Sequence, residues 1–462
     1  MKRKILPLVL SSIVLSGCTS ITQSNQEKAF TGAISQGDVA SAINYAKNEA
    51  SIDPETGLPD DLLWALQSGT ILYGNGSYKE SIVYFDAAED VMRIEDTEGV
   101  VADSTQTAGS LFGNDAMLDY EQTQYDGVMA NYYKAWSFWN LGDTQNARVE
   151  WNRAEERQRR AVQYFKSEIL DQKEELAKED GEKTEGIKKA VESDATNKAL
   201  SGAGINNTWQ SYDGYINPAV TYAGGLFFML NGESHSDYQK SADLLQRVYS
   251  ITNDPSVKTD LQMANALAKG ESKSAFKPAV WVIVEDGMSA SFSEVRVDLP
   301  LGVLKNSKVQ YVGMAFPKMV DGTQSNSSIQ VGEYQTHVIA DMDKIIGGEF
   351  NTELPMIITR EITRATLKAG AQAIAENQDA TGLAGLALGL VSAFTTGADT
   401  RSVTALPNSI QLARFNKTSN KINIKVGSFD VPLELSPDSK NQIVHIRTYN
   451  NLIAPKITVI DI

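Results

Sequence analysis

The sequence predicts an α+β protein, with an irregular array of tetratricopeptide-like helical hairpins followed by a β-sandwich-like module with inserted helices. Small residues recur at helix-packing positions within residues 27–272, and apolar residues alternate at strand spacing within 275–462. A helical pattern interrupts these strands at about 354–396. The length of 462 residues allows two or three domains, and 42% hydrophobic residues suffice to build their cores.

The first 26 residues carry an export and anchoring signal, in which a basic start and a short apolar run precede a cysteine. The basic residues are Lys2, Arg3 and Lys4, and the lipobox is Leu15, Ser16, Gly17 and Cys18. We expect residues 1–17 to be removed and Cys18 to be acylated, leaving 18–26 as a flexible polar tether. An ordinary export signal or a short membrane anchor is the alternative, but Cys18 is the only cysteine in the chain.

Acyl chains at Cys18 would hold the mature protein at a membrane. Thr19, rather than Asp, follows the cysteine, which resembles the pattern of lipoproteins that reach the outer membrane, so we expect a lipid-anchored protein there that faces the periplasm. Losing the three basic residues of the signal takes the formal charge from −16 to −19. This acidic balance excludes nucleic acid as an expected partner.

Two stretches match a tetratricopeptide hairpin, in which small residues let two helices approach and a glycine marks the turn. The matching residues are Gly69, Gly76, Tyr78, Ser81, Phe85 and Ala88 in the first, and Ala135, Gly142, Ala147, Trp151 and Ala154 in the second. Weaker copies surround Gly37 and Gly232. The turn glycines are separated by 39, 66 and 90 residues, so we expect insertions between the hairpins. An unrelated helical bundle is the alternative.

Two further segments of the helical half are candidates for partner contact. Residues 155–195 are rich in Glu, Lys, Gln and Ala, and predict a charged helical arm that docks a partner or simply faces solvent. Tyr120, Glu121 and Tyr125 combine aromatic rings and a carboxylate in a long connection. They form either a recognition site or a plug at one end of the helical groove.

The strand-rich half contains eight short segments with strand patterns, the first beginning at Ala279 and the last ending at Ile462. Its helical insertion ends in an uncharged stretch with Gly382, Gly385 and Gly389 among Leu and Ala residues. This spacing is typical of close helix contacts, so the stretch at 380–398 is either a buried helix or a membrane-inserting or self-associating one.

Several motifs of this half resemble an uncharacterised family of Gram-negative outer-membrane lipoproteins with a tetratricopeptide-like N-terminal half. They are WVIVEDGMSASFSEVRVDLPL, GMAFPKM and ADTRSVTALPNSIQLARF. Such proteins commonly carry an aromatic residue at the position of Val403. Because valine has no aromatic ring, the resemblance does not imply a stacking role for this residue. Members tend to be encoded beside lipoproteins that activate penicillin-binding proteins, which implies a role in the envelope and supplies no catalytic residues.

The residues predict no enzyme, cofactor or metal site. His235, His337 and His445 lie far apart in sequence, without ligand-spaced partners, and no phosphate-binding loop or nucleophile elbow occurs. We interpret Glu285-Asp286-Gly287 as a tight turn rather than a carboxylate pair. Asp399 and Arg401 are expected to form an ion pair that orders the loop after the inserted helix.

These features predict a lipid-anchored, non-catalytic scaffold or adaptor that binds periplasmic or envelope proteins through the groove of its helical array. The alternative is an oligomeric envelope assembly or export component that self-associates through the glycine-spaced helix at 380–398. A cell-wall or glycan enzyme is the third possibility. Homo-oligomerisation is compatible with each of them.

Overall fold

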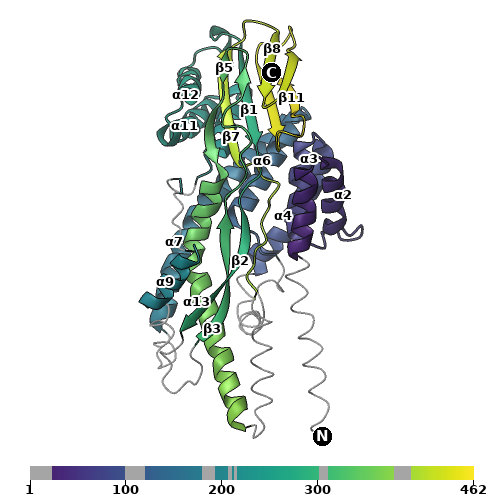
Figure 1. Cartoon of the computed structure of the whole chain (residues 1–462). Coiled ribbons are helices and arrows are strands. Elements are labelled where there is room, and N and C mark those ends of the chain that lie inside the picture. Colours follow the sequence, from purple (N-terminus) through teal and green to yellow (C-terminus); the bar gives the residue numbers. More distant parts are fainter. Residues whose placement is uncertain are drawn as a thin grey trace.

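The computed structural model describes residues 23–98, 120–178, 193–205, 211–212, 216–300, 311–378 and 397–462. Their helices and strands confirm the predicted α+β class, with a helical array first and most strands after it. Figure 1 shows an elongated molecule, with the sheets at one end and a long helix beside a two-stranded ribbon running toward the other.

The helical half is built from antiparallel helix pairs joined by short turns. After a helix at residues 23–35 come α2 (Val39–Ala50), α3 (Leu62–Gly74), α4 (Tyr78–Glu98), α6 (Gln124–Asn140), α7 (Thr144–Lys178), α9 (Asp194–Gly202), α10 (Pro218–Asn231), α11 (His235–Thr252) and α12 (Pro255–Ala268). Helix α3 packs on α4, α6 on α7 and α10 on α11. All four predicted turn glycines lie between paired helices, and Gly37, Gly76 and Gly142 have positive φ angles of 90°, 81° and 78°.

Polar caps fix where these helices begin, because each cap side chain accepts a hydrogen bond from an N–H group of the first turn. The capping residues are Asp38, Asp61, Thr123, Asn217, Ser234 and Asp254. Every residue of α3 is buried, and so are nearly all residues of α6 and α10. These three helices therefore form the inner layer of the array, and their partners form the outer layer.

In two of the hairpins, a hydrogen bond from a serine hydroxyl to a glycine carbonyl joins the paired helices. The Ser81 hydroxyl donates a 2.7 Å hydrogen bond to the Gly69 carbonyl, and the Ser241 hydroxyl does the same to Gly225. A Cβ atom at Gly69 would lie 2.8 Å from the Phe85 ring. The small residues thus let the paired helices approach closely, as the sequence pattern predicts, whereas the role of Ser241 was not foreseen.

The strand-rich half contains two sheets that pack face to face. The larger has the order β11-β10-β1-β7-β6, and the smaller has the order β5-β4-β8-β9. The bounds are β1 (Ala279–Asp286), β4 (Gln330–Val331), β5 (Tyr334–Gln335), β6 (His337–Asp341), β7 (Ser409–Asn416), β8 (Lys421–Val426), β9 (Phe429–Glu434), β10 (Gln442–Thr448) and β11 (Lys456–Asp461). Strand β1 runs parallel to β10 and antiparallel to β7. Val282, Phe415 and Ile424 belong to the apolar cluster between the sheets.

Two of the predicted strands lie outside this sandwich. Strands β2 (Ser291–Pro300) and β3 (Tyr311–Val320) pair only with each other among the described residues, forming an antiparallel ribbon beside α13 (Met342–Gln378). The expected start of the inserted helix near 354 is wrong, because α13 begins twelve residues earlier and continues through Pro355. Ile346, Phe350 and Leu354 are buried at helical spacing across this first part of the helix, which also contains Gly347 and Gly348.

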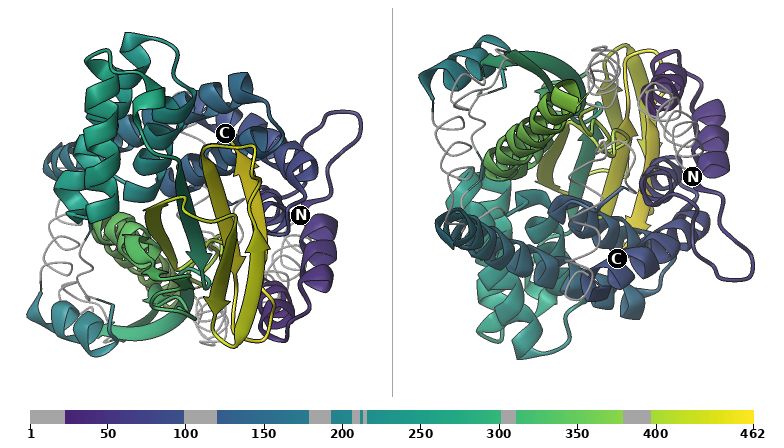
Figure 2. Two further views of the ribbon diagram at one scale, coloured as in Figure 1. Left: turned by 90° about the horizontal axis from the view of Figure 1, so that it is seen from above. Right: turned by 90° about the horizontal axis from the view of Figure 1, so that it is seen from below.

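The second face of the larger sheet fills the concave side of the helical array. Trp281, Ile283 and Leu412 join the inner helices in one continuous hydrophobic core. Seen along the molecule in Figure 2, the helices curve around this sheet. The helical and strand halves meet near residue 275, where η3 (Lys273–Ala275) precedes β1, but they are not separately packed. The groove expected to receive a partner is therefore occupied by the chain itself.

Candidate functional site

Five residues selected from the sequence lie around one cavity of about 1090 Å³, which we name the α13 cleft. It is lined by Tyr120, Glu121, Gln122, Thr123, Tyr125, Tyr164, Phe292, Ala315, Pro317, Ile346, Glu349, Phe350, Glu353, Met356, Ile357, Arg360, Glu361, Ala398, Asp399 and Arg401. These side chains come from the segment before α6, from α6 and α7, from the β2–β3 ribbon, from α13 and from the segment before β7. The cleft is the candidate site because it brings together the connection that carries Tyr120, Glu121 and Tyr125 and the loop that carries Asp399 and Arg401.

The contacts of Arg401 join these two segments. Its guanidinium forms an ion pair with Asp399 at 2.7 Å, and the guanidinium carbon lies 5.6 Å from the centre of the Tyr120 ring. The Tyr120 hydroxyl donates a 2.6 Å hydrogen bond to Asp126, and burial together with this carboxylate raises the pKa of Tyr120 well above its ordinary value. Tyr120 is thus a neutral, fixed ring in the cleft wall.

A buried carboxylate of α13 accepts hydrogen bonds from the first residues of α6. Glu349 accepts hydrogen bonds from the backbone N–H groups of Gln124 at 2.6 Å and Tyr125 at 3.3 Å. A negative charge at a helix N-terminus is favourable, but burial and repulsion from Glu353 raise the pKa of Glu349 well above its ordinary value. Glu349 therefore fixes α13 against α6 at the base of the cleft.

The apolar side of the cleft is formed where the ribbon meets α13. The rings of Phe292 and Phe350 lie 5.2 Å apart, and Pro317 lines the cavity beside them. On the same ribbon, Glu294 accepts a 3.1 Å hydrogen bond from the backbone N–H of Ala398. The ribbon thereby positions the segment that carries Asp399 and Arg401.

The beginning of the described chain adjoins this site. Gln23 and Glu27 line a smaller cavity together with Thr400 and Arg401. Glu27 also lines a cavity with Phe292 and Ala398. The first helix therefore lies directly against two cleft segments, although it is far from them in sequence.

The other predicted site residues lie elsewhere. The lipobox residues Leu15, Ser16, Gly17 and Cys18 and the helix-association residues Gly382, Gly385 and Gly389 are outside the described residues. The repeat residues pack between helices: Ala88, Ala135, Ala147, Trp151 and Ala154 are buried, and Tyr78 donates a 3.0 Å hydrogen bond to Thr458. In the expected charged arm, α7 is one helix to Lys178, with Phe165 buried, and residues 179–192 are not described.

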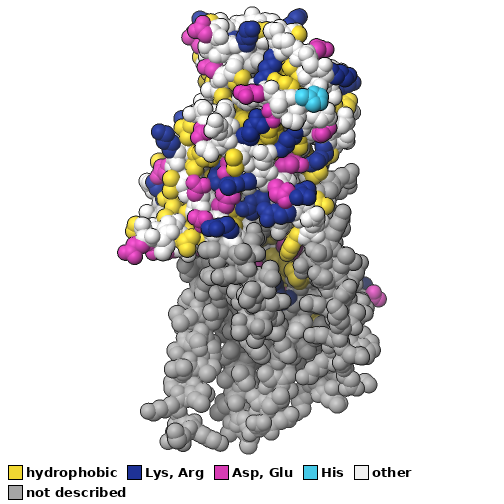
Figure 3. Space-filling view, turned by 180° about the vertical axis from the view of Figure 1, so that it is seen from behind, with side chains coloured by type: hydrophobic (Ala, Val, Ile, Leu, Met, Phe, Trp, Pro, Cys, Tyr) yellow, Lys and Arg dark blue, Asp and Glu magenta, His cyan; other side chains and the backbone are white. Residues whose placement is uncertain are grey.

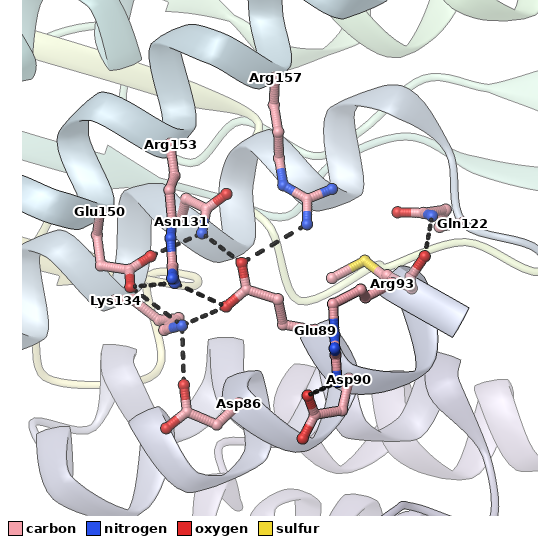
Figure 4. Close-up of polar contacts among 11 residues, drawn as sticks. Asp86, Glu89, Asp90, Arg93, Gln122, Asn131, Lys134, Glu150, Arg153 and Arg157 are labelled. Carbon is pink, nitrogen blue, oxygen red and sulfur yellow. Dashed lines mark hydrogen bonds and ion pairs between the residues drawn. The ribbon is translucent and has the colours of Figure 1, made fainter. Parts of the chain in front are cut away.

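A second polar cluster holds three helices of the array together, as Figure 4 shows. Lys134 of α6 is 2% exposed, and its Nζ atom lies 2.8 Å from Asp86, 2.5 Å from Glu89 and 3.2 Å from Glu150. Arg153 lies 2.9 Å from Glu150 and 3.4 Å from Glu89. Burial opposes the charge on Lys134, but attraction to Glu150 and Glu89 outweighs it and raises the lysine pKa. The cluster fixes α4 and α7 against α6.

The outer face of the array carries basic and acidic side chains next to one another (Figure 3). The Arg148 guanidinium lies 2.6 Å from Asp237 and joins α7 to α11, while Arg159 lies 2.7 Å from Glu156 within α7. Exposed ion pairs of this kind contribute little stability, up to about 1 kcal/mol each. Among the described residues of this face, basic and acidic side chains are thus interspersed.

A buried polar layer joins the array to the sheet, and it includes one of the histidines. His445 Nε2 lies 3.3 Å from Glu285 and 3.2 Å from the Tyr73 hydroxyl. The parallel pairing of β1 and β10 places Glu285 beside it, although the two residues are far apart in sequence. His337 likewise lies near a carboxylate, with its Nδ1 atom 3.5 Å from Asp254. Glu285 and Asp286 are the last two residues of β1 and are fully buried, and the turn begins at Gly287.

Asp260 of α12 is another charged contact between array and sheet. It accepts hydrogen bonds from the Trp281 indole at 3.0 Å and the Tyr222 hydroxyl at 2.7 Å, and Arg414 lies 3.2 Å away. Burial raises the pKa of Asp260 to about 6, against the attraction of Arg414. Asp260 therefore binds a proton more tightly in the folded protein than in the unfolded chain.

This shift predicts that part of the stability is lost as the pH rises. Between the unfolded pKa near 4 and the folded pKa near 6, the folded state holds more protons, so the free energy of unfolding falls with increasing pH. Between pH 5.0 and 7.5, the free energy of unfolding should fall by about 1 kcal/mol more in the wild-type protein than in the Asp260→Asn variant, because asparagine does not bind this proton. Urea unfolding at both pH values measures it. The exposed Asp438→Asn variant is the control, and an unchanged pH dependence in Asp260→Asn would contradict the prediction.

Two kinds of feature are absent from the described residues. They contain no group of three or more His, Cys, Asp or Glu side chains arranged to hold a metal ion. In the same part of the chain, no helix has both the length and the apolar character needed to cross a membrane.

No protein-family model matches the sequence, and no curated protein matches it. The resemblance to an envelope lipoprotein family is accordingly a basis for a proposal alone.

Sequence reasoning found one half of the cleft and missed the other. Tyr120, Tyr125, Asp399 and Arg401 were selected from composition and from motif, but the α13 wall was not. Its signal was present: Ile346, Phe350, Glu353 and Ile357 follow helical spacing, and all four line the cleft. Gly347, Gly348 and Pro355 obscured it, because such residues usually interrupt helices.

Proposed function

We propose that this protein is a lipid-anchored, non-catalytic scaffold of the bacterial outer membrane that faces the periplasm and binds an envelope protein through the α13 cleft. The lipobox supports the anchor, and the resemblance to an envelope lipoprotein family supports the location. A link to cell-wall synthesis is part of the proposal only through that resemblance.

One structural observation carries the proposal: the predicted contact residues line a single cavity next to the first helix. Gln23 is only five positions after Cys18, and this distance along the chain spans at most about 18 Å when fully extended. An acylated Cys18 would therefore keep the first helix and the neighbouring cleft close to the membrane.

The bonding of the cleft residues supports a binding role rather than a chemical one. The Tyr120 hydroxyl is bonded to Asp126, Asp399 to Arg401, and Glu349 to two backbone N–H groups. These partners hold the side chains in fixed positions. A rigid wall of rings and charges is what a protein-binding site requires, because little conformational entropy is lost on association.

The anchor is tested by metabolic labelling with an alkyne-bearing fatty acid. We expect the wild-type protein to incorporate the label and to require detergent for extraction, and the Cys18→Ser variant to incorporate none. Ser16→Ala is the matched control, because alanine keeps a small residue before the cysteine and should preserve labelling. An unlabelled wild-type protein that is recovered without detergent would refute the proposed anchor.

Partner binding is tested in intact cells with a photoreactive amino acid at Tyr164 on the edge of the cleft. Val83, which is 55% exposed on the outer face of α4, is the control position. We expect one adduct of reproducible mass from position 164 and none from position 83. Equal adducts at both positions, or none at either, would contradict binding at the cleft.

A further inference from the structure

The α13 cleft has the shape of a groove along one face of a helix. Ile346, Phe350, Glu353, Ile357 and Arg360 follow one another three or four residues apart, so they form a single stripe on α13. At 1.5 Å per residue, the stretch from 346 to 361 is about 22 Å long. The β2–β3 ribbon forms the opposite side through Phe292, Ala315 and Pro317.

The lining combines an apolar interior with an acidic edge. Phe292, Phe350, Met356 and Ile357 supply large apolar side chains, and three tyrosines line the same cavity. Five carboxylates and two guanidinium groups also line it: Glu121, Glu349, Glu353, Glu361 and Asp399 against Arg360 and Arg401. Asp399 is paired with Arg401, and Glu361 is paired with Arg364 at 2.6 Å. With Glu349 protonated, four carboxylates therefore face three guanidinium groups, which leaves an excess of one negative charge in the cleft.

We propose that the α13 cleft binds a cationic, amphipathic peptide segment of a partner protein. Large apolar side chains of the peptide occupy the interior, and its lysines or arginines face the acidic edge. About six extended residues span the 22 Å groove. The negative lining disfavours nucleic acid and anionic lipid, and it complements a basic peptide. This inference rests on the proposed scaffold function and names the chemistry of its partner.

The test uses the full-length protein in detergent and two fluorescent peptides of 12 residues. Both peptides have the same leucine and phenylalanine positions, and lysine in one is replaced by glutamate in the other. We expect the lysine peptide to raise the fluorescence anisotropy on binding and the glutamate peptide to bind at least about tenfold more weakly. Half-molar salt should weaken binding of the lysine peptide.

Two variants locate the site. Glu121 is exposed at the cleft edge, and we expect Glu121→Lys to weaken binding of the lysine peptide by about tenfold. Glu434→Lys makes the same charge change on β9, where the carboxylate is 78% exposed, and should leave binding unchanged. Met356→Trp fills the cleft without changing its charge and should also weaken binding, with circular dichroism checking the fold.

Three outcomes would overturn the inference: neither peptide binds, the glutamate peptide binds as well as the lysine peptide, or Glu121→Lys and Glu434→Lys behave alike. A photoadduct at Tyr164 with twice the mass of the chain would identify a second copy as the occupant, and it would overturn the inference too. The fatty-acid labelling result is independent of these outcomes, so failure of the peptide test leaves the anchor intact.

Discussion

Replacing Lys134 with methionine is expected to lower the free energy of unfolding by about 3 kcal/mol. Methionine has a similar length and keeps the packing, but it removes the positive charge that lies within 3.2 Å of Asp86, Glu89 and Glu150. Glu150 is 5% exposed, so water cannot replace the lost partner. Arg153 remains, which keeps the expected loss at the lower end of the range for buried ion pairs.

Urea unfolding of Lys134→Met measures this loss. Arg159→Met is the matched control, because Arg159 lies on α7 with 65% of its side chain exposed, and its pair with Glu156 should contribute less than about 1 kcal/mol. Adding Glu150→Gln to Lys134→Met should recover part of the loss, since it removes one of the repelling carboxylates. Equal effects of Lys134→Met and Arg159→Met would show that the buried cluster does not stabilise the array.

The second large effect is expected at Gly287, where Gly287→Ala should cost about 4 kcal/mol. The residue has a φ of +76°, which alone costs an alanine about 1 kcal/mol. A Cβ atom would also lie 1.8 Å from the Thr323 carbonyl oxygen, so the backbone between β1 and the ribbon would have to move. Gly287 donates its N–H to Thr448, and this bond is expected to be lost as well.

Gly142→Ala separates the two contributions. Gly142 has a φ of +78°, but no atom lies within 4 Å of a Cβ placed there. We therefore expect a loss of about 1 kcal/mol at Gly142 and a much larger loss at Gly287, measured by thermal unfolding. Comparable losses at the two glycines would mean that the backbone near Thr323 adjusts freely.

Local patterns predicted most elements of the fold. Alternating apolar residues identified β1, β7 and β10, and small residues at positions such as Gly69 and Ala135 identified the hairpins. The patterns succeeded because burial on one face imposes a period on the segment itself. They missed only the first twelve residues of α13. There Phe350 contacts Phe292 of the ribbon and Glu349 bonds to α6, and these contacts stabilise a helix that contains Gly348.

The candidate site could be predicted only in pieces. Tyr120 and Arg401 stood out because aromatic and charged residues occurred in connecting segments, but no sequence pattern brought them together. Their contact depends on α6, the ribbon and α13 packing in one place, and Glu349 at the start of α6 is the contact that fixes α13 there. Long-range packing of this kind leaves no period in the sequence.

The sequence alone indicated most of the helices and strands, and it supplied the lipobox on which the proposed anchor depends. These properties reside in single segments, through caps such as Asp61, turn glycines such as Gly76 and alternation such as that of β1. Only the tertiary structure decided that the sheet fills the groove of the array and that the α13 cleft is the remaining candidate surface. Several inner helices are apolar on all sides, and they require an internal partner, whose identity depends on the packing of the whole chain.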